Sequence, residues 1–342
     1  MEYKLLKIIN ESQRIFITSH ISPDPDAITS VLLLGATLRK SYPDKQVETV
    51  LDEEPTTDIQ MLGGYNNIAF GSAYDQLVRL KPDLFIMLDV ANFSRISRDE
   101  GPRIKSFIKD VDAKTVIIDH HEETGRDDAD LYINEHLPAT VQQVYKTAFT
   151  GLKLSKPDGY AETTMLGILS DTNRFKYQNP HHRETFELVS DLIDAGARIE
   201  KLEYAAERYS RDDLAVLAEF LKNIKEDPLG YTYSYLNDDF INQRRADSRP
   251  FSAIKNGSDL FVNNYIRNVG DSLWGFSLYK EYLSGENMYS ARLRAVEGSG
   301  DMSQLAAKLG GGGHKGAAGA KFEASNLQAA LRKVQDAIRQ SA

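Results

Sequence analysis

The sequence contains no cysteine and only one tryptophan among its 342 residues. Without thiols the chain can form neither a disulfide bond nor a thiolate zinc site, and their absence is typical of a reducing compartment. No hydrophobic run approaches the ~20 residues of a membrane-spanning helix. Residues 1–9 are amphipathic and show no secretory cleavage site. We therefore expect a cytoplasmic protein with no membrane partner.

Positive charge is also scarce, because 41 Lys and Arg stand against 50 Asp and Glu, for a net charge of −9. Proteins that hold long nucleic acid usually present a basic surface, so long RNA or DNA is not expected as a partner. A very short nucleotide held by metals and two or three arginines stays compatible with this charge. The length and the 41% hydrophobic content indicate a soluble chain of two domains.

Four apolar segments of the N-terminal half lead into aspartate or histidine. Residues 14–18, 84–88 and 116–118 read as buried strands, whereas residues 165–171 fit a strand or a buried helix equally well. Ligands bind beyond the carboxyl ends of the strands in an open parallel sheet, so we expect the polar residues that follow to meet at one edge. These residues are His20, Asp24, Asp26, Asp89, Asp119, His120, His121 and Asp171.

A mixed set of carboxylates and imidazoles predicts a site for divalent transition metals. Mn²⁺ or Fe²⁺ fits these ligands better than Ca²⁺, with Co²⁺ as a further option. Six or seven ligands exceed the need of one open catalytic ion and suit two ions that share a carboxylate. Taken singly, an Asp at a strand end is more often a helix N-cap, and a lone His is more often a hydrogen-bonded core residue. The recurrence of the pattern favours the metal site.

A second chemical feature lies near the C-terminus, where Gly310–Gly313 precede His314. Consecutive glycines let the backbone approach a ligand closely, and their N–H groups can bind an anion. The alternative is a flexible turn before a strand at residues 317–322. Arg292 and Arg294 lie two apart on a predicted strand and so share a face. Either guanidinium can bind phosphate in a bidentate manner.

These residues together resemble the motifs of the DHH phosphoesterase superfamily. The resemblance rests on His20-x3-Asp24-x-Asp26-Ala27, Asp89, Asp119-His120-His121 and Asp171, and on Leu309–Gly319, which is similar to the glycine-rich motif of the DHHA1 domain. It spans nearly the whole chain and is strongest for the nanoRNase-like subgroup. Members of that subgroup degrade very short oligonucleotides and often 3′-phosphoadenosine 5′-phosphate, and cyclic-dinucleotide phosphodiesterases share the same core.

The resemblance implies a role for each motif residue. It implies that one metal is held by His20 and Asp24, the other by Asp26, His120 and Asp171, and both by the bridging Asp89. It also implies that Asp119 orients a histidine, as a metal site usually requires, and that His121 faces the scissile phosphate. In the second domain it implies nucleotide binding by Gly311, Gly312, Gly313, His314 and Arg294, with Arg292 as a lesser candidate on a solvated face.

The chain departs from the family pattern in a few places. Thr29 and Asn173 stand where glycine is usual, and the bulk of Thr29 is predicted to narrow the phosphate pocket. The pair His181-His182 could be mistaken for a second metal site, but we interpret it as the exposed start of a helix over 183–195. Thr140 fits a helix N-cap.

The fold class expected is α/β. Residues 1–190 are predicted to form a doubly wound parallel sheet, the DHH metal-binding catalytic domain. Residues 191–227 are predicted to form a helical connector, and residues 228–342 a smaller α/β DHHA1 domain that binds substrate. Because ligand sites favour domain interfaces, the active site is expected in the cleft between the domains. A homodimer is left open.

The function expected is hydrolysis of phosphoesters by a hydroxide that two metal ions, most favourably Mn²⁺, activate. The substrates would be short RNA or DNA oligonucleotides or small nucleotides such as 3′-phosphoadenosine 5′-phosphate. Three alternatives are a cyclic-dinucleotide phosphodiesterase, a pyrophosphatase or polyphosphatase, and a non-catalytic nucleotide-binding regulator. The DHHA1-like segment argues against pyrophosphate, and the full set of ligand positions argues against a regulator.

Overall fold

A computed structural model describes residues 2–55, 59–121, 125–177, 179–206, 208–296, 298–313 and 315–340. The chain forms two compact units, Met1–Arg208 and Tyr209–Ala342. The division into 1–190, 191–227 and 228–342 expected from the sequence is finer than this and stays a prediction. Among the described helices, none combines the length and the apolar character needed to cross a membrane.

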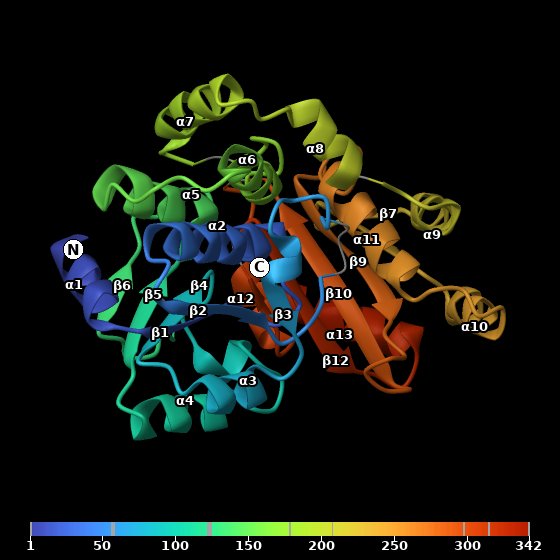
Figure 1. The fold of residues 1–342 in the computed structure, drawn as a ribbon. Coiled ribbons are helices and arrows are strands. Elements are labelled where there is room, and N and C mark those ends of the chain that lie inside the picture. The colour runs from blue at the N-terminus through green and yellow to red at the C-terminus, as the bar shows by residue number, and fades with distance from the viewer. Residues whose placement is uncertain are drawn as a thin grey trace. The chain divides into compact units, whose positions relative to one another are not determined.

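The first unit is built on a six-stranded parallel sheet in the order β3-β2-β1-β4-β5-β6 (Figure 1). Its strands are β1 (Arg14–Thr18), β2 (Gln46–Leu51), β3 (Ile68–Phe70), β4 (Leu84–Leu88), β5 (Lys114–Ile118) and β6 (Leu131–Ile133). Every residue of β4 is buried, and a strand covered on both faces reads as a continuous apolar run. The strand order reverses between β1 and β4, which is where open α/β sheets bind ligands. The predicted doubly wound sheet is confirmed.

Helices cover both faces of this sheet. Residues alternate along β1, so that Ile15 and Ile17 join one core and Phe16 the other. Helices α1, α2, α5 and α6 pack in the first core, and α3 and α4 in the second (Figure 1). The helices of the unit are α1 (Glu2–Glu11), α2 (Pro25–Ser41), α3 (Ala73–Leu80), α4 (Gly101–Asp110), α5 (Thr140–Tyr145), α6 (Tyr160–Asp171), α7 (His182–Asp194) and α8 (Ile199–Ala206), with short turns η1 (Tyr65–Asn67), η2 (Phe93–Arg95) and η3 (Lys146–Gly151).

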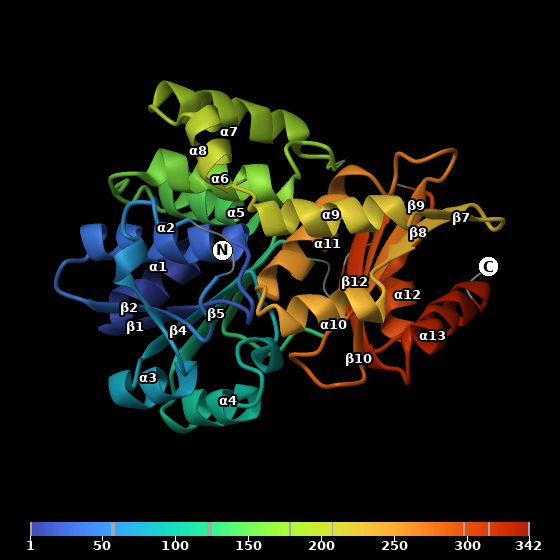
Figure 2. The ribbon, with the colours of Figure 1, turned by 90° about the vertical axis from the view of Figure 1, so that its right-hand side faces the viewer.

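The second unit contains a mixed six-stranded sheet in the order β11-β12-β10-β9-β8-β7 (Figure 2). Its strands are β7 (Lys225–Asp227), β8 (Tyr231–Tyr235), β9 (Trp274–Lys280), β10 (Met288–Ala295), β11 (Gly312–Gly313) and β12 (Ala317–Glu323). Its helices are α9 (Arg211–Lys222), α10 (Asp238–Ala246), α11 (Ser252–Asn264), α12 (Met302–Lys308) and α13 (Leu327–Arg339). Helices α12 and α13 pack in one core and α9, α10 and α11 in another. The smaller α/β domain expected from the sequence is thus confirmed.

Two sequence segments take more definite forms than the sequence alone allowed. Residues 165–171, which fitted a strand or a buried helix, are the second half of α6. Residues 191–227, expected to form a helical connector, contain the end of α7, then α8 and α9, and the short strand β7. Helix α7 ends before Gly196, whose φ of 103° other residues rarely adopt, and a capping box of Ser210 and Asp213 starts α9. The 3.6-residue hydrophobic period is the same in each helix, so it does not reveal where one helix ends and the next begins.

Candidate active site

The side chains singled out in the first unit lie beyond the carboxyl ends of β1, β4 and β5. His20 follows β1 by two residues, Asp89 follows β4 directly, and Asp119 follows β5 directly. Since β1 and β4 flank the reversal of strand order, the loops after them face each other across the sheet edge. Two helices complete the arrangement. Asp24 is the N-cap of α2, which is the alternative to a metal ligand that the sequence offered for a single Asp, and Asp171 is the last residue of α6.

Potential ligand atoms gather here in three groups, within each of which all atoms lie within 4.8 Å of one another. The groups are His20, Asp24 and Asp89; Asp26, His120 and Asp171; and Asp89, His120 and His121. The structure thus brings together all six residues predicted as metal ligands, and His121 with them. Asp89 belongs to two of the groups, as a carboxylate between two ions would.

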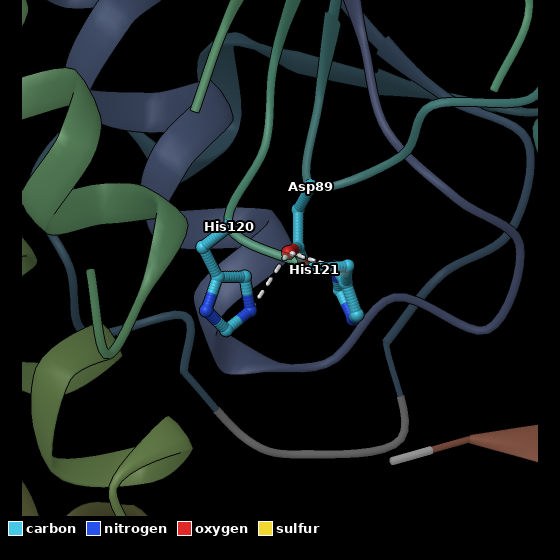
Figure 3. A group of neighbouring side chains, drawn as sticks. All are labelled: Asp89, His120 and His121. Carbon is cyan, nitrogen blue, oxygen red and sulfur yellow. Dashed lines mark ion pairs between the residues drawn. The ribbon is translucent and has the colours of Figure 1, made fainter. Parts of the chain in front are cut away.

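Asp89 is the centre of this arrangement and is only 1% exposed. His20 Nε2 lies 3.3 Å from its Oδ2, whereas His120 Nε2 and His121 Nδ1 lie 3.6 and 3.5 Å from its Oδ1. Figure 3 shows the two neighbouring imidazoles on either side of the carboxylate. Asp89 adopts a φ of 58°, a left-handed conformation that aspartate tolerates better than most residues and that clusters at functional sites. Its two oxygens therefore face different sets of ligands.

The electrostatics of the site are those of an anionic cluster. Desolvation and the charge of Asp89 raise the pKa of Asp24 to about 6, and burial with Asp89 and Asp171 raises the pKa of Asp26 well above its usual value. Burial acts to lower the pKa of His20, but its hydrogen bond to Asp89 prevails and raises that pKa to about 9. Crowded carboxylates hold protons or attract cations. A set of oxygen and imidazole donors with this charge fits divalent metal ions.

The histidines differ in what holds their second nitrogen. Nδ1 of His20 lies 2.8 Å from the carbonyl oxygen of Ile21, and Nδ1 of His120 lies 3.1 Å from that of Leu137. In both rings Nε2 is then the nitrogen that faces the carboxylates, and a carbonyl behind a metal-facing imidazole is the usual arrangement at metal sites.

His121 has a carboxylate in that place. Its Nδ1 lies 2.7 Å from Asp119 Oδ1, which also accepts the backbone N–H groups of His120 and His121. The His121 side chain is 28% exposed, against 9% for His120. The histidine that Asp119 orients is therefore the more accessible one. This hydrogen bond outweighs burial and raises the pKa of His121.

Thr140 is a site residue that the sequence interpretation missed. Its predicted role as an N-cap is wrong, because Ala139 occupies that position and Thr140 is the first residue of α5. The Thr140 hydroxyl donates a hydrogen bond to Asp89 Oδ1 at 2.9 Å. The backbone N–H groups of Thr140 and Val141 donate to the two oxygens of Asp26, at 2.7 and 2.9 Å. A polar residue at the start of a helix was the available signal, but its partner lies far away in the sequence.

The two departures from the family pattern have local structural explanations. Thr29 is fully buried and donates its hydroxyl to the Pro25 carbonyl. A Cβ on Gly167 of α6 would lie 2.3 Å from the Thr29 Oγ1, so the Thr29 side chain packs against α6. The predicted narrowing of a phosphate pocket stays a prediction. Asn173 begins three left-handed residues, with Arg174 and Phe175, at φ of 46°, 55° and 62°, and asparagine accepts that conformation more readily than most residues.

In the second unit, Arg292 and Arg294 project from β10 toward α11. Arg292 Nη1 lies 3.4 Å from Asp259 Oδ1, and Arg294 Nε donates to Asn263 Oδ1 at 2.8 Å. Arg292 therefore has a carboxylate partner within its own domain, and its side chain is 27% exposed. This pairing weakens its case as a phosphate ligand relative to Arg294.

The glycine run has a packing role that is visible in the structure. A Cβ on Gly311 would lie 2.1 Å from the carbonyl oxygen of Gly319. Gly312 and Gly313 form β11 against β12, and Gly313 has a φ of 139° that excludes most other residues. His314 lies outside the described residues. Nucleotide binding by this run, and a site in the cleft between the domains, stay predictions.

The pair His181-His182 lies at the start of a helix, as expected, but both residues are half-buried rather than exposed. Helix α7 begins at His182, and the three ligand groups found among the described residues contain neither histidine.

Comparison with known proteins agrees with the resemblance. Residues 14–168 match the DHH family, N-terminal domain, and residues 259–340 match the DHHA1 domain. Proteins described as bifunctional oligoribonuclease and PAP phosphatase NrnA are similar in sequence. The one from Mycoplasma genitalium is 25% identical over 92% of this chain and 90% of its own, and the one from Thermus thermophilus is 26% identical over 95% and 89%. The match to the Bacillus subtilis protein, at 27% identity, spans 56% of each chain.

Solved structures show the same fold. An exopolyphosphatase-related protein from Bacteroides fragilis superposes with a TM-score of 0.82 at 22% identity, over 99% of this chain and 95% of that one. The exonuclease RecJ bound to manganese gives a TM-score of 0.51 at 15% identity, over 99% and 93%. The chain therefore matches the DHH family model in its N-terminal part and the DHHA1 domain model in its C-terminal part.

Proposed function

We propose that this protein is a metal-dependent phosphoesterase that hydrolyses short oligonucleotides or small nucleotides such as 3′-phosphoadenosine 5′-phosphate. The observation that carries the proposal is Asp89, a buried carboxylate whose Oδ2 faces His20 and whose Oδ1 faces His120 and His121. This is the donor arrangement that two-metal hydrolases use. The similarity to oligoribonuclease and PAP phosphatase proteins supports the choice of substrate class.

The carboxylate and imidazole donors of this site suit two divalent ions, and Mn²⁺ suits such a mixture. One ion would be held by His20 and Asp24 and the other by Asp26, His120 and Asp171, with Asp89 between them. Bound there, the ions would supply Lewis acidity toward the phosphoryl oxygens and activate water as the nucleophile.

His121 and Asp119 form the proposed acid–base pair. Nδ1 of His121 faces Asp119, and Nε2 is proposed to contact the substrate phosphate. The hydrogen bond with Asp119 raises the pKa of His121 and so favours the charged form of the ring. A charged imidazole at this position can stabilise negative charge on the phosphoryl oxygens or protonate the leaving oxygen. Asp119 fixes the ring and compensates its charge.

The DHHA1 domain is proposed to hold the part of the substrate that does not react. Arg294 would bind a phosphate, with Gly311, Gly312, Gly313 and His314 forming the surface for the rest of the nucleotide. The net charge of −9 is consistent with short substrates and no long nucleic acid. A cytoplasmic location also belongs to this proposal.

A substrate panel tests the proposal. The purified protein with Mn²⁺ is assayed against a dinucleotide, 3′-phosphoadenosine 5′-phosphate, a cyclic dinucleotide, pyrophosphate and a long RNA. We expect turnover of the first two, loss of turnover with a chelator, and little action on the long RNA. Preferred hydrolysis of the cyclic dinucleotide or of pyrophosphate would replace the substrate proposed here. Absence of hydrolysis on every substrate, with metal bound, would indicate a nucleotide-binding regulator instead.

A further inference from the structure

We propose that Thr140 is a positioning residue that fixes the rotation of the Asp89 carboxylate, so that each oxygen faces one metal. The inference rests on the proposed function, because it assumes that Asp89 lies between two ions. It concerns a residue outside the DHH-type motifs, placed 51 positions along the chain from the carboxylate that it contacts. All of the contacts involved lie within the first unit.

The Asp89 carboxylate requires an external constraint to keep its orientation. The terminal torsion of aspartate is broad and roughly two-fold, so the side chain alone does not decide which way its oxygens point. His20 faces Oδ2, and His120 and His121 face Oδ1. The Thr140 hydroxyl donates to Oδ1 at 2.9 Å. This bond occupies one lone pair of Oδ1 and opposes rotation of the carboxylate away from the two groups.

Threonine is well suited to this task at this position. Both Thr140 and Asp89 are almost completely excluded from solvent, so no water competes for the bond. A β-branched side chain has few allowed χ1 rotamers, and in helices the threonine hydroxyl often bonds a carbonyl one turn earlier. As the first residue of α5, Thr140 has no earlier turn of its own helix to bond. Its hydroxyl is therefore directed to the carboxylate.

The same residue reaches the second metal group through its backbone. The N–H groups of Thr140 and Val141 hold the two oxygens of Asp26. A side-chain substitution leaves these two bonds in place, so the effect of the hydroxyl on Asp89 can be measured separately. A shift of α5 as a whole would disturb Asp26 as well.

The test compares Thr140→Val, which keeps the shape and removes the hydroxyl, with Thr140→Ser, which keeps the hydroxyl. Thr37→Val is the matched control, because Thr37 is equally buried but donates to the Leu33 carbonyl within α2. Mn²⁺ is titrated into each metal-free protein by calorimetry, and electron paramagnetic resonance follows the coupling between paired ions. Melting of the metal-free proteins reports the fold.

We expect Thr140→Val to fold, to bind Mn²⁺ about 10- to 100-fold more weakly, and to lose the signal of coupled ions. Thr140→Ser and Thr37→Val should stay within about threefold of the wild type. If Thr140→Val does not fold, Thr140→Ala is titrated in its place and the same weakening is expected.

The outcomes separate the two proposals. If the wild type pairs two ions and Thr140→Val does so with equal affinity, the role of Thr140 is overturned and the proposed function stands. Equal weakening in Thr140→Val and Thr140→Ser would also overturn it, because the hydroxyl would then not be the cause. If the wild type binds no Mn²⁺, the two-metal function fails and the inference fails with it.

Discussion

His120 and His121 are adjacent in sequence, yet their surroundings predict opposite effects of the same substitution. His120 is 9% exposed, and its Nε2 lies 3.1 Å from Asp171 and 3.6 Å from Asp89. It belongs to two of the ligand groups, with Asp26 and Asp171 in one and with Asp89 and His121 in the other. His120→Ala should therefore weaken one metal site by more than the about 10- to 100-fold that loss of an outer partner costs. The variant should carry about half the wild-type metal.

His121→Ala should leave the metal content near normal. The ring is held by Asp119 and is more exposed than that of His120. Its loss removes acid–base assistance, which contributes about 10²- to 10⁴-fold to rate, or about 3–5 kcal/mol in barrier height. Turnover of a dinucleotide should fall by that factor, with little change in metal binding.

The assay is elemental analysis of proteins loaded with Mn²⁺ and desalted, together with steady-state kinetics of the same samples. His181→Ala serves as the control, since this histidine lies outside the three ligand groups. His121 Nδ1 lies 3.5 Å from Asp89 Oδ1, so a direct ligand role for His121 is the competing interpretation. Equal metal loss in His120→Ala and His121→Ala would refute the division of roles and support that alternative.

Three further predictions concern the bridge, the pH dependence and the second domain. Asp89→Asn should lower turnover at least about 100-fold with an unchanged fold, as checked by kinetics and circular dichroism; full activity would contradict two shared ions. The pKa of Asp24 is raised to about 6 and that of His20 to about 9, so Mn²⁺ must displace protons from both residues at low pH. The stabilisation of the fold by Mn²⁺ in a melting assay should therefore grow from about pH 5 to about pH 8; a flat profile would exclude these ligands. Arg294→Ala should impair hydrolysis of nucleotides but spare a bis-nitrophenyl phosphate diester, which has no nucleoside to bind; equal loss on both substrates would remove the clamp role.

The sequence predicts much of the first unit for a physical reason. Strands such as residues 84–88 are covered on both faces, so they are uninterrupted apolar runs that stand out from their surroundings. Parallel strands place their carboxyl ends at one edge, so the polar residues that follow β1, β4 and β5 had to meet. Which of them contact each other could not be derived in this way, because that depends on side-chain directions. The pairing of Asp119 with His121 is an example.

The remaining features depend on contacts between distant residues. Residues 165–169 of α6 are all buried, and such a segment lacks the periodicity that separates helix from strand. Arg292 gave no sign that Asp259 on α11 would pair with it. The local sequence pattern predicts a single helix or strand, but it does not show which distant residues that helix or strand contacts.

Thr140 shows how a local rule fails at a functional site. The first N–H groups of a helix lack partners within it, and a side chain of the preceding residue usually accepts from them. At α5 that residue is Ala139, and Asp26, 114 positions away, accepts from Thr140 instead. The positive end of the helix favours the negative charge of Asp26, and a metal ligand needs that charge. In return, Asp26 accepts hydrogen bonds from the first N–H groups of the helix. The start of α5 and the anionic site therefore depend on each other. Because the Thr140 hydroxyl does not cap its own helix, it can donate its hydrogen bond to Asp89.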